Sequence, residues 1–218
     1  MSKDRLSGSL YDDKDVLEKF RYFENRYYQE MTITKVSGDC PYGHKEGEKY
    51  KVSNCNSNGL CGALYKRLHD SIVTLHYWGS LPWEKDPDRY IGICPEMKVE
   101  VESRRFEREN PGILKATTSL RNMTGKGFPA VDRYRAFVEI LGVEYVCAWG
   151  NKAGLRFEID PFNTGGVCGN LYSKIYPYLN ILLAGVNFPW SAHDHEMISV
   201  CPDSYNQTSF RLVIEERK

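Results

Sequence analysis

An internal repeat constrains this chain more than any other feature. The segment 56–83 reads NSNGLCGALYKRLHDSIVTLHYWGSLPW, and the segment 163–190 reads NTGGVCGNLYSKIYPYLNILLAGVNFPW. Three landmarks recur with a constant offset of 107 residues, namely Cys61 and Cys168, Tyr65 and Tyr172, and Trp83 and Trp190. Because about 100 residues is the size of a small domain, we expect two tandem copies of one such domain.

Three cysteines keep their spacing in both copies. Copy one has Cys40, Cys61 and Cys94, and copy two has Cys147, Cys168 and Cys201, with gaps of 21 and 33 residues each time. Many of their neighbours differ, so the constant spacing predicts that folding brings each cysteine triad to one place. The seventh cysteine, Cys55, and the nearby His44 are not repeated, since Phe162 and Asn151 stand at the matching positions.

The residue patterns predict an α+β fold. In copy one, 31–36 and 48–52 are predicted strands, a helix begins near residue 60, and a further strand covers about 98–102. Copy two begins with a strand at 136–143 and ends with one near 209–215. The helices should bury Leu64, Leu68, Ile72 and Leu75 and, in copy two, Leu171, Ile175, Leu179 and Leu182. Each copy is therefore predicted to be a β-β-α-β unit, an antiparallel sheet covered by a helix, and the two copies to pack together.

These signals divide the chain into four parts: an N-terminal helix over 1–30, repeat 1 over 31–107, a connector over 108–135 and repeat 2 over 136–218. The aromatic N-terminal helix is expected to pack against the repeats or to dock a protein partner. The connector is expected to hold one short helix. Pro177 should kink or split the second helix, because proline lacks a backbone N–H. Trp83 and Trp190 are expected to anchor the loops that follow the helices.

Composition argues against several functions. The 29 basic and 29 acidic residues cancel, so the chain lacks the positive charge typical of proteins that bind nucleic acid or anionic membranes. No apolar run is long enough for a transmembrane helix, and the N-terminal residues lack the apolar core of a signal peptide. A cytoplasmic location is therefore expected, where thiols usually stay reduced.

Four interpretations of the cysteines are open. They are structural core residues, ligands of zinc or an iron–sulfur cluster, reactive thiols, or haem ligands within Cys-Pro pairs. As metal ligands, the six triad cysteines would need a fourth donor, for which copy one offers Cys55 or His44 and copy two His193 or His195. As thiols, Cys61 and Cys168 are the candidate catalytic residues, since each precedes a helix start, where partial positive charge lowers a thiol's pKa.

Each copy also resembles a family of small, uncharacterised prokaryotic proteins that carry cysteines. In copy one the matching pieces are GEKY at 47–50, GLC at 59–61, GSLPW at 79–83 and CPE at 94–96. In copy two they are GLRF at 154–157, GVC at 166–168, GVNFPW at 185–190 and CPD at 201–203. The resemblance implies a single-domain unit in tandem and implies no activity. Copy two departs from the pattern at Ala148, where copy one has Pro41, so copy two would be the degenerate half.

The sequence thus predicts a cytoplasmic protein of two cysteine-triad domains that binds zinc or an iron–sulfur cluster and is accessory to a redox system. A thiolate enzyme that uses Cys61 or Cys168 is the first alternative. The second is an interaction module with structural cysteines and no cofactor.

Overall fold

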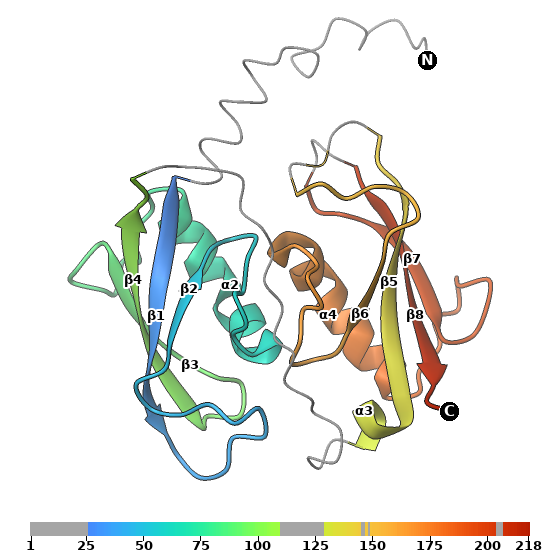
Figure 1. Ribbon diagram of the computed structural model, residues 1–218, viewed down its shortest axis with the longest axis horizontal. Helices are drawn as coiled ribbons and strands as arrows, with labels where there is room; N and C mark the ends of the chain where they lie inside the picture. Colours follow the sequence, from blue (N-terminus) through green and yellow to red (C-terminus); the bar gives the residue numbers. More distant parts are fainter. Residues whose placement is uncertain (1–25, 110–128, 145–146, 148, 204–206) are drawn as a thin grey trace, which may run out of the picture.

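The structure is a computed structural model, and it describes residues 26–109, 129–144, 147, 149–203 and 207–218. These residues form two halves of the same architecture, each a four-stranded antiparallel sheet with one long helix (Figure 1). The fold is therefore α+β, and its two similar halves are consistent with a tandem duplication.

Repeat 1 contains β1 (Tyr27–Val36), β2 (Lys49–Val52), α2 (Gly62–His76), β3 (Arg89–Ile93) and β4 (Val99–Glu107). Its strands lie in the order β2-β1-β4-β3. Strand β1 alternates buried and less buried residues over most of its length, which is the period-two pattern of a sheet with one covered face.

Repeat 2 contains the five-residue α3 (Pro129–Arg133), then β5 (Tyr134–Gly142), β6 (Arg156–Ile159), α4 (Gly169–Leu183), β7 (Glu196–Val200) and β8 (Ser209–Glu216). The strand order β6-β5-β8-β7 repeats that of the first sheet. Both sheets also break register at the same point, between Ile33 and Lys35 in β1 and between Ile140 and Gly142 in β5. The two halves therefore share an irregularity as well as a topology.

The predicted β-β-α-β unit is wrong by one strand, because each repeat has a further edge strand, β3 or β7. Strand β3 reads RYIGI and fully buries only Tyr90, so it shows no clear alternation. It is held by pairing with β4, from Arg89 opposite Arg104 to Ile93 opposite Glu100. When a strand forms mainly because it pairs with another strand, its own residues need not show a strand pattern.

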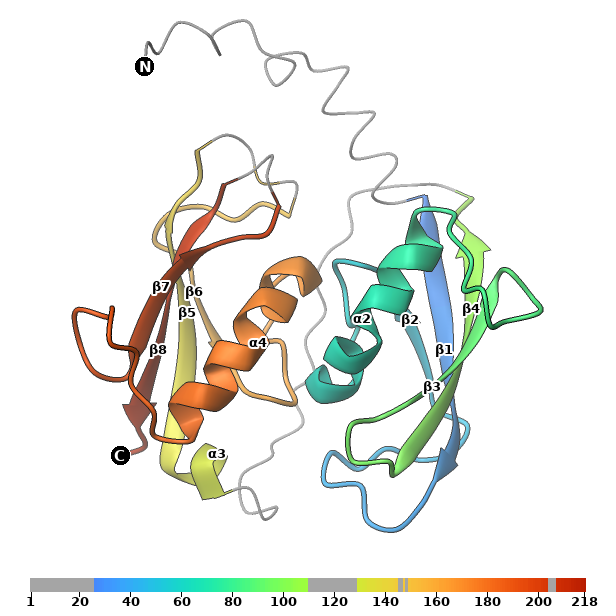
Figure 2. The same ribbon diagram turned by 180° about the vertical axis from the view of Figure 1, so that it is seen from behind.

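The two long helices lie side by side in the middle of the molecule, with one sheet on the outer side of each (Figures 1 and 2). The predicted helical stripes are buried as expected, at Leu64, Leu68, Ile72 and Leu75 and at Leu171, Ile175, Leu179 and Leu182. These residues belong to one continuous apolar core that includes both repeats. The repeats therefore share a core, as the size of each unit suggests.

Equivalent residues meet each other at the centre of this interface. The hydroxyl oxygens of Ser57 and Thr164, which are 107 residues apart, lie 3.3 Å from each other. Lys66 Nζ donates a hydrogen bond to Ser173 Oγ at 2.9 Å, again between counterparts 107 apart. Contacts between a residue and its own counterpart are the signature of an approximate two-fold axis, here between two halves of one chain.

Two predictions about helices need correction. Strand β1 begins at Tyr27, so an N-terminal helix does not continue to Glu30; its remainder lies in 1–25, outside the described residues. Pro177 lies within one continuous helix, α4, so the predicted split is wrong. The four buried apolar residues of α4 hold this helix in the shared core, and their burial outweighs the single hydrogen bond that proline removes.

Other predicted segments lie partly outside the described residues. Much of the connector, 110–128, is among those not described, and the described part holds the short helix α3 directly before β5. None of the helices formed by the described residues has the length and apolar character needed to cross a bilayer.

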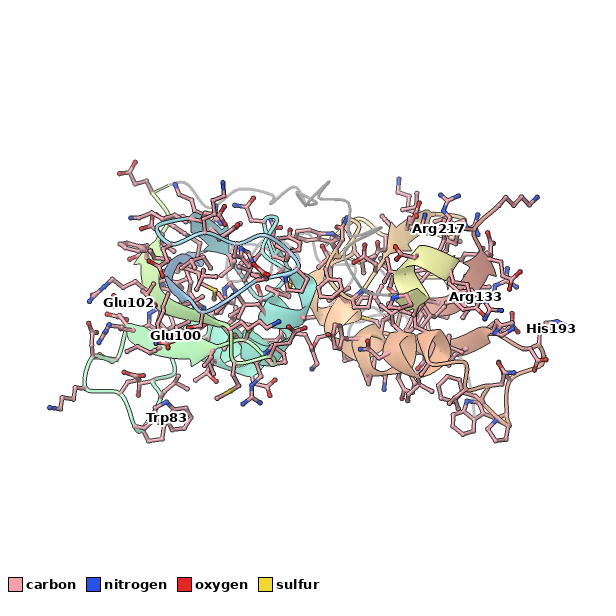
Figure 3. The ribbon with its side chains drawn as sticks, turned by 90° about the horizontal axis from the view of Figure 1, so that it is seen from below. Trp83, Glu100, Glu102, Arg133, His193 and Arg217 are labelled. Atoms are coloured by element: carbon pink, nitrogen blue, oxygen red, sulfur yellow. The ribbon has the colours of Figure 1, made fainter. Side chains whose placement is uncertain are left out.

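The two tryptophans after the helices do not anchor their loops, contrary to expectation. Trp83 is 71% exposed and Trp190 70%, and Trp83 lies on the outlying loop after α2 (Figure 3). The buried anchors are Leu81 and its counterpart Phe188, two residues earlier. The loops therefore turn their branched or aromatic residue inward and leave the tryptophan in solvent.

Candidate thiol sites

The three cysteines of repeat 1 line one pocket of about 130 Å³. Cys40 lies in the loop after β1, Cys61 is the N-cap of α2, and Cys94 directly follows β3. Tyr42 helps to bring the first two together, because its hydroxyl donates a 2.6 Å hydrogen bond to the carbonyl of Gly59. The sequence spacing therefore predicts a real convergence of side chains in this repeat.

The glycine turn before Cys61 has a conformational reason. Gly59 has φ +82°, and its counterpart Gly166 has φ +88°, a left-handed backbone that residues with a Cβ rarely adopt. As Tyr42 does at Gly59, a side chain in repeat 2 donates to the glycine carbonyl: Trp149 Nε1 donates a 3.4 Å hydrogen bond to the carbonyl of Gly166. Each turn sets the direction from which the chain enters its helix and so places the N-cap cysteine.

Backbone amides donate to the sulfur atoms of five of the six triad cysteines. Cys94 Sγ accepts hydrogen bonds from the amides of Lys98 and Val99, each at 3.3 Å. Helix-start amides reach Cys61 and Cys168, and turn amides reach Cys147 and Cys201. Such donors point at the place where negative charge develops on a bound thiolate.

Without a bound cation, burial disfavours negative charge on these thiols. It raises the pKa of the Cys61 thiol to about 12, although the amides of Leu64 and Ala63 act in the other direction. Burial likewise raises the pKa of Cys201 to about 12 and raises that of Cys147. Desolvation therefore disfavours the thiolate at Cys61, and the helix-start amides only partly offset it.

His44 also lines the pocket and belongs to a polar group that sequence reasoning missed. Its Nδ1 lies 3.2 Å from Glu48 Oε2 and 3.1 Å from the hydroxyl of Tyr50, which in turn donates to the same carboxylate at 2.7 Å. A carboxylate that engages one imidazole nitrogen orients the ring and directs the other nitrogen elsewhere. Comparison of the copies carries the signal, because copy two replaces all three residues, with Asn151, Leu155 and Phe157.

The three cysteines of repeat 2 lie at the equivalent places in their half of the fold. Cys147 follows β5, Cys168 is the N-cap of α4, and Cys201 directly follows β7, the same three places as in repeat 1. Charge on Cys168 raises the pKa of both Cys147 and Cys201, although burial is the larger cause at each. The polar group around His44 has no equivalent here, so repeat 2 holds the simpler site.

Cys55 belongs to the second site and not to the first. It is not among the residues that line the pocket of repeat 1; its carbonyl instead accepts a 2.8 Å hydrogen bond from the amide of Gly169. Its thiol hydrogen-bonds to the sulfur of Cys168 and so lowers the pKa of that buried thiol. The helix-start amides of Leu171 and Asn170, the predicted cause of a lower pKa here, contribute less than Cys55.

The histidines proposed as fourth ligands in copy two lie elsewhere. The ring of His195 packs 6.2 Å from that of Tyr134, at the start of β5, whereas Cys147 follows the end of that strand. Strand β5 is about 27 Å long, so His195 lies at the end of the strand opposite to the loop that carries Cys147. His193 is exposed on an outlying loop (Figure 3). Neither histidine is brought to the triad.

Three thiols line the pocket of repeat 1, but their side chains are not arranged as the ligands of a single metal ion. Across the described residues, no three histidine, cysteine, aspartate or glutamate side chains are placed to hold one metal ion. All seven cysteines are thiols, and none forms a disulfide. The arrangement suits three kinds of thiol chemistry: coordination of a soft metal centre, thiol–disulfide exchange, and nucleophilic attack by a thiolate.

Comparison with known proteins adds no assignment. The chain matches no protein-family model, no curated protein and no solved structure. The geometry of the two thiol sites is therefore the basis for the functional argument that follows.

Proposed function

We propose that the cysteine triads bind a thiophilic metal centre, zinc or an iron–sulfur cluster, and that repeat 1 holds the more complete site. The observation that carries this proposal is the pocket lined jointly by Cys40, Cys61, Cys94 and His44. Thiolate sulfur and imidazole nitrogen are the donors that zinc and iron–sulfur centres take.

The electrostatics support a cation more than a free thiolate. A buried thiolate at Cys61 is disfavoured in the metal-free protein, as its raised pKa shows. A metal centre supplies the missing positive charge at contact distance and displaces the thiol protons when it binds. The backbone amides already directed at Cys94 then stabilise the sulfur that has lost its proton.

The separation of the donors favours a cluster over a single ion. Zinc requires all its ligands around one atom at about 2.0–2.3 Å, and no three described donors are so placed. A cluster takes one cysteine at each of several iron atoms and accepts a wider separation. Cys40, Cys61 and Cys94 would hold such a cluster, and His44, which lines the same pocket, is the candidate for a fourth ligand. A bound cluster would supply one-electron transfer.

The test is metal analysis of full-length protein purified without oxygen. We expect stoichiometric iron and sulfide, or zinc, and loss of most of it when Cys40, Cys61 and Cys94 are changed together to serine. The matched variant changes Cys147, Cys168 and Cys201 and should lose less. His44→Asn, which installs the residue of copy two, should weaken retention of the centre by about 10–100-fold.

Two results would overturn the proposal. One is wild-type protein that takes up neither iron nor zinc under reconstituting conditions while folded. The other is a Cys61 thiol that iodoacetamide alkylates at pH 8 as fast as a free cysteine. With a pKa near 12, only about one Cys61 in 10⁴ is a thiolate at that pH. Fast alkylation would instead support the thiolate enzyme.

A further inference from the structure

We propose that Cys55 and Cys168 form a reversible disulfide that fastens the two repeats to each other. This inference does not depend on metal binding, because it concerns a pair of thiols across the interface and the pocket of repeat 1 does not include Cys55.

The backbone already holds the two cysteines together. The amide of Gly169, the residue after Cys168, donates a 2.8 Å hydrogen bond to the carbonyl of Cys55. Asn170 Nδ2 lies 3.6 Å from Cys55 Sγ, and the Cys55 thiol is hydrogen-bonded to the sulfur of Cys168. Two sulfur atoms in hydrogen-bond contact need only side-chain rotation to reach bonding distance, provided that the backbone does not resist.

The approximate two-fold axis supplies an internal comparison. On the other side of the axis, the amide of Gly62 donates to the carbonyl of Phe162 at 2.7 Å, so Phe162 takes the place beside Cys61 that Cys55 takes beside Cys168. The same backbone arrangement therefore occurs twice, and only one of its two copies carries a second thiol. The pair is a feature of this one position and not of the fold as such.

The two thiols differ in exposure, and this difference sets the order in which they would react with a disulfide reagent. Cys55 is partly exposed and Cys168 is buried. A low-molecular-weight disulfide, RSSR, therefore reaches Cys55 first. Cys168, held beside Cys55 by the helix start at Gly169, then supplies the second sulfur.

The disulfide would form by thiol–disulfide exchange in two steps. The Cys55 thiolate attacks one sulfur of RSSR; a bond from Cys55 to SR forms, the original S–S bond breaks, and one RS⁻ leaves with the proton that Cys55 lost. The Cys168 thiolate then attacks the Cys55 sulfur, which forms the protein disulfide and releases the second RS⁻ with the proton of Cys168. Two electrons pass from the protein to RSSR, which becomes two RSH.

Oxidation would change both the interface and the second thiol site. The disulfide links segments that are far apart in the sequence, so it restricts the unfolded chain and holds the repeats together. It also withdraws Cys168 from the triad with Cys147 and Cys201. The reduced protein keeps that triad complete.

The experiment uses full-length, metal-free, reduced protein incubated with oxidised glutathione in the absence of oxygen. Peptide mapping under non-reducing conditions should give a crosslink between Cys55 and Cys168, reversed by dithiothreitol. The thermal midpoint should rise by about 5–15 °C on oxidation. Cys55→Ala should abolish both the crosslink and the shift, and the triple serine variant of Cys40, Cys61 and Cys94 should retain them.

A designed variant tests the geometry itself. Phe162→Cys in the Cys55→Ala background should give the mirror-image crosslink, between Cys61 and the new thiol. The proposal is overturned if native wild-type protein crosslinks Cys168 to Cys147 or Cys201 instead. It is equally overturned if Cys55 and Cys168 remain thiols at a glutathione ratio that crosslinks the urea-unfolded chain. Neither outcome depends on whether the protein binds metal.

Discussion

The amide of Gly62 donates a hydrogen bond to the carbonyl oxygen of Phe162, 2.7 Å away in the other repeat. Gly62 is the first residue of α2, and the first amides of a helix have no partner within it. The equivalent amide of α4, from Gly169, bonds to Cys55. Each repeat therefore completes the start of the other's helix, so backbone hydrogen bonds join the two repeats in addition to their shared core.

Gly62→Ala should destabilise the protein by about 1–3 kcal/mol, the usual cost of excess volume in a packed core. A Cβ at this position would overlap the hydroxyl group of Tyr172, which packs across the interface. The free energy of unfolding, measured by urea denaturation, checks this.

Tyr172→Phe provides the matched background, because it removes the overlapping oxygen. Gly62→Ala should cost less there than in the wild type, with a coupling of at least about 0.5 kcal/mol. The ring carbon that carries the hydroxyl remains 2.9 Å from the added Cβ, so an equal cost in both backgrounds would show that the hydroxyl oxygen is not the cause.

Much of this fold is predictable from local pattern. The helical stripe from Leu64 to Leu75 and the alternation in β1 depend on residues near in sequence, and both are found where the patterns place them. Strand β3 is not predictable in this way, because its pairing with β4 supplies the hydrogen bonds that define it. The exposure of Trp83 is missed for a related reason, since Leu81 already fills the buried place.

The candidate sites also differ in how far the sequence predicts them. The equal spacing of the cysteines predicts the convergence of Cys40, Cys61 and Cys94, because it reflects a repeated fold. The position of Cys55 beside Cys168 depends on how the repeats pack across a two-fold axis. No pattern within one repeat carries that information, so the sequence groups Cys55 with the triad of its own repeat, whereas the structure places it beside Cys168.

The stability of the protein should fall as the pH rises from about 4 to about 6, through Asp160. Burial raises the pKa of this carboxyl to about 6, although the amides of Phe162 and Asn163 donate hydrogen bonds to it at 2.7 and 2.9 Å. In this pH window the unfolded chain has lost the proton and the folded chain keeps it, so unfolding releases a proton and higher pH favours it. At about 1.4 kcal/mol per pKa unit, the loss is about 1–3 kcal/mol.

Asp160→Asn separates this effect from other titrations. Asparagine keeps an oxygen that accepts from both amides but carries no charge, so the variant should be more stable than the wild type at pH 7 and equal to it near pH 4. Urea denaturation across this range measures the difference. Parallel stability curves for the two proteins would show that Asp160 titrates normally.

The loop after α2 offers a final contrast between two apolar residues of one short segment. Leu81 is 7% exposed and packs into the shared core, whereas Trp83 is 71% exposed. Leu81→Ala should therefore cost about 2–5 kcal/mol through lost burial and the cavity left behind, and Trp83→Ala should change the free energy of unfolding by less than about 0.5 kcal/mol. In the second half of the chain the ring of Trp190 lies 5.1 Å from that of Phe188, so Trp190→Ala should cost somewhat more than Trp83→Ala and still less than Phe188→Ala. A large loss of stability from Trp83→Ala would mean that the tryptophan packs against the fold after all, because a side chain in solvent has little burial to lose.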